Sequence, residues 1–519
     1  MKGKNPIIMM IAMIVALGGL LMGFDASVIS GVIKFIEPEF NLSKLQLGWS
    51  VASLTVTATL AMLVAGPISD VVGRRTVLRV AAVLYAISAV ASALAPNYMF
   101  LVIARMLGGF GVGASLILAP MYIAEMAPPA IRGRLVSFNQ LNIVIGISLA
   151  FFTNYLILQL GKSDASWVAN LGIGEHNWRW MLGLEAIPAV LYFFGLFFVP
   201  TSPRWLILKG RYEEATKVLS KYVEPSEAET TVQEIKEHIE LEKQKDKVPI
   251  ASLFKPAMRL VLVIGIVVAV LQQITGINSV FFYAPMIFEQ SGIGTDASFI
   301  QAILVGIINL VFTIIAILLI DKLGRKPLLS IGVAGMTISL FLLAYGFNSA
   351  TYTIQPASVS GLVEDVDLSG LNSIAGKTYA SDVDFNKALQ ASLPSELVVA
   401  HKTEIIKAAI DMNPKLILGG ILAFVASFAI SLGPVMWVLF SELFPNHIRG
   451  IAISFVGFIN SGVSFVVQWV FPWQLEAIGN AGTFFIYGVF ALIGLIFIIR
   501  VIPETKGKSL EELEAQLVK

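Results

Sequence analysis

Twelve long apolar segments constrain this chain more than any other feature. Each has about the 20 mostly apolar residues that a helix needs to cross the hydrocarbon core of a bilayer. Stretches of this length and character are typical of transmembrane helices, so we predict an all-α polytopic membrane protein. The predicted segments are 7–35, 48–70, 76–95, 98–126, 134–160, 178–199, 259–288, 299–321, 327–347, 415–441, 450–471 and 481–502.

Composition supports this class and argues against several others. Hydrophobic residues make up 56% of the 519 and charged residues only 14%, whereas soluble proteins carry about 25% charged residues. The net charge of +1 argues against a nucleic-acid-binding protein, which normally has a marked basic excess. Without cysteine there is no disulfide, thiolate metal site or thiol nucleophile. The four histidines lack metal-ligand spacing. No phosphate loop or nucleophile–base motif is present, so we expect neither an enzyme nor a cofactor.

The first segment and the basic residues predict the topology. After Lys2 and Lys4, the apolar stretch of about 29 residues exceeds the 7–15 of a signal-peptide core, so we interpret it as a true span. Lysine and arginine are concentrated in alternate connections between segments. The positive-inside rule then places both termini in the cytoplasm. We expect a monomer in the lipid bilayer of the plasma membrane, and specifically of a bacterial inner membrane.

Two motifs occur twice, at matching places in the chain. DVVGRR follows the second segment, and DKLGRK follows the eighth, 251 residues later. EMAPPAIR follows the fourth segment, and ELFPNHIR follows the tenth, 317 residues later. The difference of 66 matches the polar stretch 348–414, which we interpret as an insertion on the outer side.

The repeats divide the chain into two homologous halves of six helices each. We predict an N-terminal half at 1–202, a cytoplasmic helical linker at 203–256, a C-terminal half at 257–502 that contains the insertion, and a cytoplasmic tail at 503–519. Parallel repeats of this kind are typical of transporters whose substrate site lies between the halves, near the midplane.

The charged residues of the repeated motifs are candidates for ion pairs at the cytoplasmic helix ends. Such pairs would latch the halves together when the protein faces outward, although positive charge there also serves simply to fix the topology. The candidates for this cytoplasmic gate are Asp70, Arg74, Glu125, Arg132, Asp321, Arg325, Glu442 and Arg449.

Three ionisable residues of the first half fall at a similar depth. Counting 1.5 Å per residue places Asp25 roughly 15 Å, and Arg105 and Glu185 roughly 10 Å, from the outer face. Charged groups at such depth are usually paired and functional. An aspartate beside an arginine stays ionised, and it takes a proton when it moves from that partner into apolar surroundings. We therefore predict a proton-coupling site here, with a static structural ion pair as the alternative.

Amide side chains mark a second candidate site. Gln272, Gln273 and Asn278 both donate and accept hydrogen bonds, and they are costly in lipid, so we expect them to face a cavity. Hydrogen bonds between helices are the alternative. Trp437 follows the Gly433-Pro434 pair, which favours a bend that acts as an inner gate.

Six stretches together resemble the sugar porter family of the major facilitator superfamily: GGLLMGFD, RMLGGFGVGASLILAPMYIAEMAPPAIRGRLVSFNQ, PTSPRWL, QQITGINSVFFYAP, GPVMWVLFSELFPNHIRG and PETKG. The resemblance covers the whole chain except the insertion. It implies alternating-access transport of a monosaccharide or similar polyol. The aspartate of GFD is similar to that of bacterial proton symporters, which implies H⁺ as the coupling ion. The implied sugar contacts are Phe24, Gln272, Gln273, Asn278, Asn309, Gly433, Trp437 and Asn460, with Phe282 and Tyr283 as an outer gate.

The chain departs from the family pattern at Ile147, Ser461, Phe282 and Thr201. The first three belong to the expected sugar pocket or its lid, so hexose and pentose both stay open. The insertion resembles the loop of proton-coupled inositol carriers, which adds myo-inositol. An uncoupled sugar facilitator, in which Asp25 is only structural, is the main alternative. A non-transporting sugar sensor is a further one, although such sensors resemble porters with a longer cytoplasmic tail.

Overall fold

The computed structural model describes residues 5–127, 131–221, 225–244, 249–359, 362–363, 366–445, 448–508 and 510–517. It separates into two compact units. The first contains Met1–Ala26, Ser53–Ala150 and Arg179–Pro249, and the second contains Ser27–Ala52, Phe151–Trp178 and Ile250–Lys519. Four helices, α1, α2, α5 and α7, therefore contribute to both units.

The first unit is built largely from helices of the predicted N-terminal half. They are α1 (Asn5–Glu39), α2 (Lys44–Val72), α3 (Arg74–Ala93), α4 (Tyr98–Met126), α5 (Arg132–Leu160), α7 (Asn177–Gly183) and α8 (Ala186–Phe198). Glycines let α1 and α5 approach closely. A Cβ at Gly23 would lie 2.0 Å from the Ile143 carbonyl oxygen, and one at Gly146 would lie 2.1 Å from that of Leu20. Small residues allow such backbone contact between membrane helices.

Three further helices of the first unit lie in the predicted linker. They are α9 (Pro203–Leu208), α10 (Tyr212–Leu219) and α11 (Pro225–Gln244). Their apolar faces form a small core that includes Leu206, Ala215 and Val232. The polar faces of α10 and α11 carry exposed charges, as expected for amphipathic surface helices.

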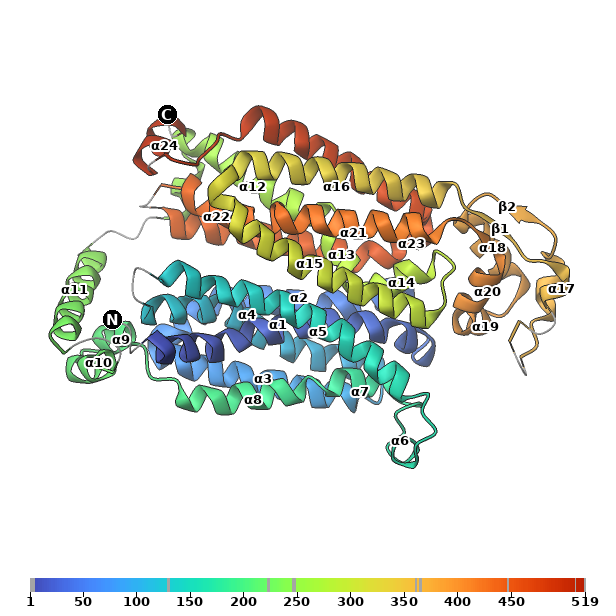
Figure 1. Ribbon diagram of the computed structural model, residues 1–519, viewed down its shortest axis with the longest axis horizontal. Helices are drawn as coiled ribbons and strands as arrows, with labels where there is room; N and C mark the ends of the chain where they lie inside the picture. Colours follow the sequence, from blue (N-terminus) through green and yellow to red (C-terminus); the bar gives the residue numbers. More distant parts are fainter. Residues whose placement is uncertain are drawn as a thin grey trace. The chain divides into compact units, whose positions relative to one another are not determined.

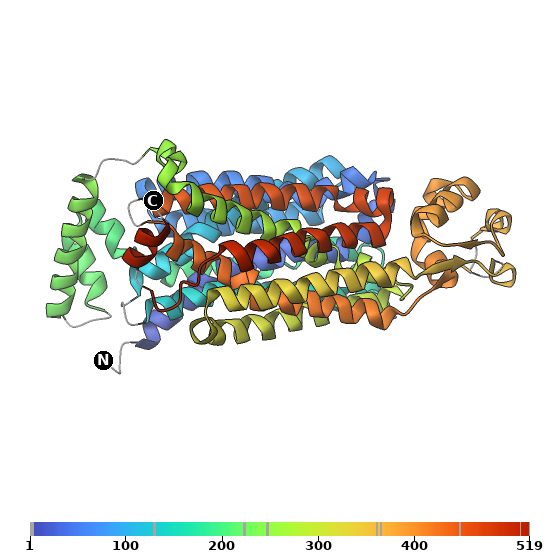
Figure 2. The same cartoon turned by 90° about the horizontal axis from the view of Figure 1, so that it is seen from above.

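The second unit is a bundle in which α16 packs along α21 and α23 (Figures 1 and 2). Its helices are α6 (Ser166–Asn170), η1 (Ile250–Phe254), η2 (Pro256–Met258), α12 (Arg259–Ile274), α13 (Ile277–Phe282), α14 (Ala284–Glu289), α15 (Thr295–Leu323), α16 (Arg325–Asn348), α21 (Pro414–Ile430), α22 (Leu432–Leu443), α23 (Arg449–Val501) and α24 (Leu510–Leu517).

Two predicted spans of the second unit are broken helices. The segment 259–288 becomes α12, α13 and α14, because Gly276 adopts φ +85° between the first two. A Cβ there would lie 2.3 Å from the Tyr487 ring, so both the backbone and the packing require glycine. The segment 415–441 breaks at Ser431, between α21 and α22.

The prediction of an all-α polytopic membrane protein is confirmed. Within the described residues, eleven helices are long and apolar enough to cross a membrane. One of these, α23, has 53 residues and a non-helical break at Gly479. It holds the predicted spans 450–471 and 481–502, so the eleven helices account for twelve spans.

The insertion folds as a small domain at one end of α16 and α21 (Figure 1). Its strands β1 (Thr351–Thr353), β2 (Thr378–Tyr379) and β3 (Ile410–Asp411) form an antiparallel sheet in the order β2-β1-β3. Its helices are α17 (Pro356–Val359), η3 (Ser369–Ser373), α18 (Asp382–Ser392), α19 (Ser395–Ala400) and α20 (Lys402–Ala409). We call this end of the second unit's helices the insertion end.

The insertion domain has its own apolar core and is tied to the helices beneath it. Tyr352 stacks on Phe385 with ring centroids 5.1 Å apart, and Leu389 and Ile405 are fully buried beside them. The Asp382 carboxylate accepts hydrogen bonds from the backbone N and the side-chain Nδ2 of Asn480, at 2.8 and 2.7 Å. The domain is therefore held by α23 as well as by its two chain connections.

Candidate functional site

The first unit contains a buried group of charges. Asp25 lies on α1, Arg105 on α4, and Glu185 at the start of α8. The Arg105 Nη1 atom lies 3.5 Å from Asp25 Oδ1, and all three side chains are 2% exposed. Glu185 interacts electrostatically with both Asp25 and Arg105. We call these three residues the charge triad. The helical rise used in the sequence analysis places them at one level, and the fold brings them together.

Two oxygen atoms of the charge triad are under-satisfied. Asp25 Oδ2 and Glu185 Oε1 are buried, and neither has a hydrogen-bond partner within the described part of the chain. Around them, a Cβ at Gly108 would lie 2.7 Å from Asp25 Oδ2 and 2.6 Å from Ser88 Oγ. Burial of a carboxylate oxygen without a hydrogen-bond donor is energetically unfavourable. The charge triad is therefore closely packed, yet two of its carboxylate oxygens lack a donor among the described residues.

The second unit contains four interlinked amides, which we call the amide cluster: Gln272, Gln273, Asn278 and Asn460. Asn460 Nδ2 donates to Gln272 Oε1 at 2.8 Å, and Gln273 Nε2 donates to Asn460 Oδ1 at 3.2 Å. Asn278 Nδ2 donates to Gln273 Oε1 at 2.8 Å. Gln272 Nε2 in turn donates to the Leu432 carbonyl oxygen at 3.0 Å, next to the break between α21 and α22. The amides are thus held in place by one another.

Two residues that the sequence analysis missed extend the amide cluster along α23. Ser464 Oγ accepts hydrogen bonds from Asn278 Nδ2 at 2.8 Å and from Gln468 Nε2 at 2.7 Å. Asn460, Ser464 and Gln468 are spaced four residues apart, so they share one helix face. This i, i+4 spacing of polar residues in an apolar helix was the available signal.

The other predicted sugar contacts have varied surroundings. Asn309 is buried on α15, and Gly433 lies in the first turn of α22, just after the break at Ser431. Trp437 is 42% exposed and meets the Phe440 ring edge-on at 5.9 Å. Phe24 is buried and belongs to the first unit, beside Asp25 on α1.

The predicted outer-gate residues lie at the second break in the segment 259–288, between α13 and α14. Phe282 ends α13, and Tyr283 separates it from α14. Both rings are buried. The Tyr283 hydroxyl donates to the Gln468 carbonyl oxygen at 2.9 Å, and its ring lies 5.1 Å from that of Phe471. Tyr283 therefore packs against α23 at the far end of the amide cluster.

The repeated motifs form two similar clusters, one in each unit, which we call the motif clusters. In the first, Arg74 lies 2.6 Å from Asp70 and 3.1 Å from Glu125. In the second, Arg325 lies 3.2 Å from Asp321 and 2.7 Å from Glu442. We call the helix ends that carry them the motif ends. The Arg74–Glu125 pair joins α3 to α4, and the Arg325–Glu442 pair joins α16 to α22. Each pair therefore connects two helices of the same unit.

A hydroxyl completes each motif cluster. Ser202 donates to Glu125, and Thr505 donates to Glu442 Oε2 at 2.6 Å. These residues hold the same place in PTS (200–202) and PET (503–505), which the sequence analysis did not align. Arg449 bonds elsewhere: its Nε donates to the Phe444 carbonyl oxygen at 3.1 Å. The side chain of Arg132 lies outside the described residues.

Comparisons with known proteins agree with this architecture. A family model described as sugar (and other) transporter matches residues 11–362 and 397–517. The arabinose-proton symporter of Bacillus subtilis is 35% identical over 512 residues, which cover 99% of this chain and 95% of that protein. The D-xylose-proton symporter of Escherichia coli is 36% identical over 545 residues, covering 99% and 96%. The major myo-inositol transporter of B. subtilis is 33% identical over 506 residues, covering 97% and 93%.

A solved structure shows the same fold. The inward open conformation of the xylose transporter from E. coli has a TM-score of 0.73 and 34% identity, and the match covers 98% of this chain and 100% of that one. The stretch that the family model leaves out, 363–396, lies inside the insertion domain. With matches over both repeats and nearly the full length of each relative, this chain belongs to the sugar transporter family of multi-pass membrane proteins.

Proposed function

We propose that this protein imports a monosaccharide together with protons by alternating access. The observation that carries the proposal is the buried charge triad, because transport of a neutral sugar alone does not require an ion pair at membrane depth. Two relatives named as proton symporters for pentoses, arabinose and xylose, support a pentose as the first substrate to test.

The amide cluster supplies the chemistry for the sugar. A sugar presents hydroxyl groups that both donate and accept, and an amide side chain matches both roles. Gln272, Gln273, Asn278 and Asn460 hold one another in fixed orientations, which lowers the entropy cost of binding. We propose that they, with Phe24, Asn309, Gly433 and Trp437, contact the substrate. Phe282 and Tyr283 would close over it from the outer side.

The charge triad supplies the proton site. Asp25 Oδ2 has no donor among the described residues, so a proton at that atom would remove the cost of a buried, partnerless oxygen. Movement of Asp25 away from Arg105 favours the protonated form, and a return to Arg105 favours release. Glu185 lies within electrostatic reach of both and would set the balance between these two states.

The basic motif ends support a cytoplasmic location for both termini and for the linker. We propose that the protein lies in a bacterial inner membrane as a monomer, with halves at 1–202 and 257–502 and the insertion outside. The motif clusters would stabilise the outward-facing state as the cytoplasmic gate.

Two alternatives within the same family use the same site. The relative named as a myo-inositol transporter supports a cyclitol substrate, which the amide cluster suits as well as it suits a sugar. An uncoupled facilitator would keep the amide cluster and use the charge triad only as a structural ion pair. The substrate and the coupling therefore need separate readouts in one experiment.

The test is uptake into proteoliposomes that contain the purified protein, with xylose, arabinose, glucose, galactose and myo-inositol as labelled substrates. Each is followed with and without an inward proton gradient, together with the internal pH. We expect accumulation of one substrate above its external concentration, with internal acidification that depends on that substrate. Equilibration without proton movement would make the protein a facilitator, and no uptake of any of the five would contradict the proposed substrate class.

A further inference from the structure

Lys34, at the insertion end of α1, is held by residues that lie far away in the sequence. Its ammonium lies 3.0 Å from Glu289 Oε1 at the end of α14 and 3.1 Å from Thr403 Oγ1 on α20. It also donates to Thr295, the first residue of α15. The Thr403 hydroxyl in turn donates to Glu289 Oε2 at 3.1 Å. All four residues belong to the second unit.

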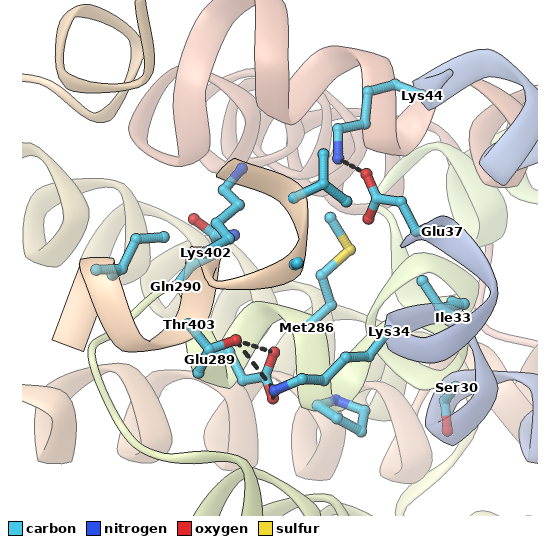
Figure 3. Close-up of a pocket in the computed structure, with 14 residues that line it drawn as sticks. Ser30, Ile33, Lys34, Glu37, Lys44, Met286, Glu289, Gln290, Lys402 and Thr403 are labelled. Carbon is cyan, nitrogen blue, oxygen red and sulfur yellow. Dashed lines mark hydrogen bonds and ion pairs between the residues drawn. The ribbon is translucent and has the colours of Figure 1, made fainter. Parts of the chain in front are cut away.

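These contacts lie in a pocket between α1, α14 and the insertion domain (Figure 3). Figure 3 shows Lys34 reaching from α1 toward Glu289 and Thr403, with Met286 above the side chain. Glu289 and Thr403 are each 8% exposed. Burial, and after it the nearby Lys44 ammonium, lowers the pKa of Lys402 on the pocket wall to about 8. The Lys34 and Glu289 side chains are 28% and 11% exposed, so salt screens this partly buried ion pair less than it screens a fully exposed one.

We propose that Lys34, Glu289 and Thr403 form an outer clamp, through which the insertion domain stabilises the state that is closed to the outside. The clamp rests on the proposed alternating-access function. The predicted first-half helix α1 contributes the cation, α14 the anion, and the insertion the hydroxyl that bonds to both. Opening of the outer side separates α1 from α14, so it must break all of these bonds. The three residues act as positioning residues of transport and do not touch the sugar.

The insertion domain suits this role because it is fixed on the side of the predicted second half. Asp382 bonds to Asn480 on α23, and both ends of the domain continue into α16 and α21. Thr403 is therefore carried by the same body as Glu289. Its hydroxyl turns a single ion pair into a closed triangle, in which each member has two partners.

A second contact at the same end provides a matched control. Lys162, after α5, pairs with Asp296 in the first turn of α15. This ion pair also joins the two predicted halves, but the Lys162 and Asp296 side chains are 52% and 50% exposed. Solvent-exposed ion pairs contribute little. Removal of Lys162 should therefore leave the closed state nearly unchanged, whereas removal of Lys34 should not.

The absence of cysteine from the chain permits a direct test. A single Ser30→Cys substitution places a thiol on α1, one turn before Lys34 and in the wall of the pocket. Ser30 is 2% exposed, and its Oγ has no partner in the described part of the chain, so the change removes no known bond. The readout is the rate at which a membrane-impermeant maleimide labels the introduced thiol at position 30 from the outside.

We expect Lys34→Met to raise the labelling rate about tenfold, because the substitution removes the charge-assisted hydrogen bonds to Glu289 and Thr403. Thr403→Val, which keeps the shape, should raise it about threefold or more, and Thr403→Ser, which keeps the hydroxyl, should restore the parent rate. Lys162→Ala should change it less than about twofold. Thermal unfolding of each variant verifies that it is folded.

Labelling needs no transported sugar, so it separates the two proposals. Parent-like labelling of both the Lys34→Met and the Thr403→Val variants would overturn the clamp, whether or not sugar is transported. Faster labelling of these variants, with rescue by Thr403→Ser, would support the clamp even if none of the five tested substrates is carried. An equal increase of the labelling rate in the Lys162→Ala variant would also overturn the clamp. Loss of any ion pair at the insertion end would then have the same effect as loss of the clamp.

Discussion

Asp25 is the residue on which the proposed coupling depends. Replacing Asp25 with Asn keeps the shape of the side chain but removes the group that binds and releases a proton. We expect Asp25→Asn to abolish accumulation against a gradient and to leave the exchange of labelled sugar between two equal pools. Both activities are measured in the same proteoliposomes, with Asp296→Asn, at a half-exposed ion pair, as the control. Loss of both activities would indicate a structural role for Asp25.

At the residue scale, the sequence predicts groups on long, unbroken helices better than groups that involve short elements. Helical rise is sufficient to bring Asp25 to the level of Arg105, since both lie on unbroken helices. Ser464 and Gln468 were within reach of the same reasoning. The outer clamp was not, because Glu289 and Thr403 are 114 residues apart. Their meeting depends on the fold of the insertion domain, where helices are short and periodicity is weak.

At the element scale, the break at Gly276 shapes the amide cluster. It separates Gln272 and Gln273 on α12 from Asn278 on α13. Gly276→Ala forces a side chain into a left-handed backbone conformation and places its Cβ 2.3 Å from the Tyr487 ring. We expect a loss of roughly 1–3 kcal/mol in the free energy of unfolding and weaker sugar binding, measured by denaturation in detergent and by substrate-induced stabilisation.

Gly419 on α21 is the control for this substitution. A Cβ there meets nothing within 4 Å, and the residue is helical. Gly419→Ala should leave stability unchanged or raise it by about 0.5–1 kcal/mol, because alanine is the better helix former. If the Gly276→Ala and Gly419→Ala variants have the same free energy of unfolding, the left-handed conformation at Gly276 does not contribute to the stability of the fold.

The two halves differ at one helix start. Glu504 accepts hydrogen bonds from the backbone N–H groups of Arg325 and Lys326 at the start of α16, each at 3.1 Å. Thr201 holds the matching place in PTS, and no comparable bond to the start of α3 is found among the described residues. We expect Thr201→Glu to raise the free energy of unfolding by about 0.3–1 kcal/mol through its interaction with the helix dipole. Thermal unfolding checks this, with Glu504→Thr expected to lower it. A destabilising Thr201→Glu would show that the halves are not equivalent here.

The ends of helices are predicted less well than the spans themselves. The apolar pattern predicts 259–288 and 415–441 as single spans, yet both are broken, at Gly276 and at Ser431. A glycine in an apolar run is compatible with a straight helix, and the Gly433-Pro434 pair predicts a bend in this span without fixing the residue at which the helix ends. Tertiary packing decides both cases: the Tyr487 ring lies against Gly276, and the amide of Gln272 bonds beside the break at Ser431.

At the scale of the whole molecule, transport requires a balance between contacts at the two ends of the helices. The outer clamp and the motif cluster around Glu442 lie at opposite ends of α15, which runs from Thr295 to Leu323. We propose that the clamp favours the state closed to the outside and the motif clusters favour the state open to it. Substitutions at the two ends should therefore shift the same equilibrium in opposite directions.

Glu442→Gln removes the charge that pairs with Arg325 and keeps the shape, so we expect slower maleimide labelling of the Ser30→Cys parent, by about threefold. Combined with Lys34→Met, it should bring the rate back toward the parent value. Because the two sites share no partner, their effects should add in free energy to within about 0.5 kcal/mol. Faster labelling in the Glu442→Gln variant would contradict the gate role of the motif clusters. A double variant that labels like Lys34→Met alone would mean that the two ends do not bias one equilibrium.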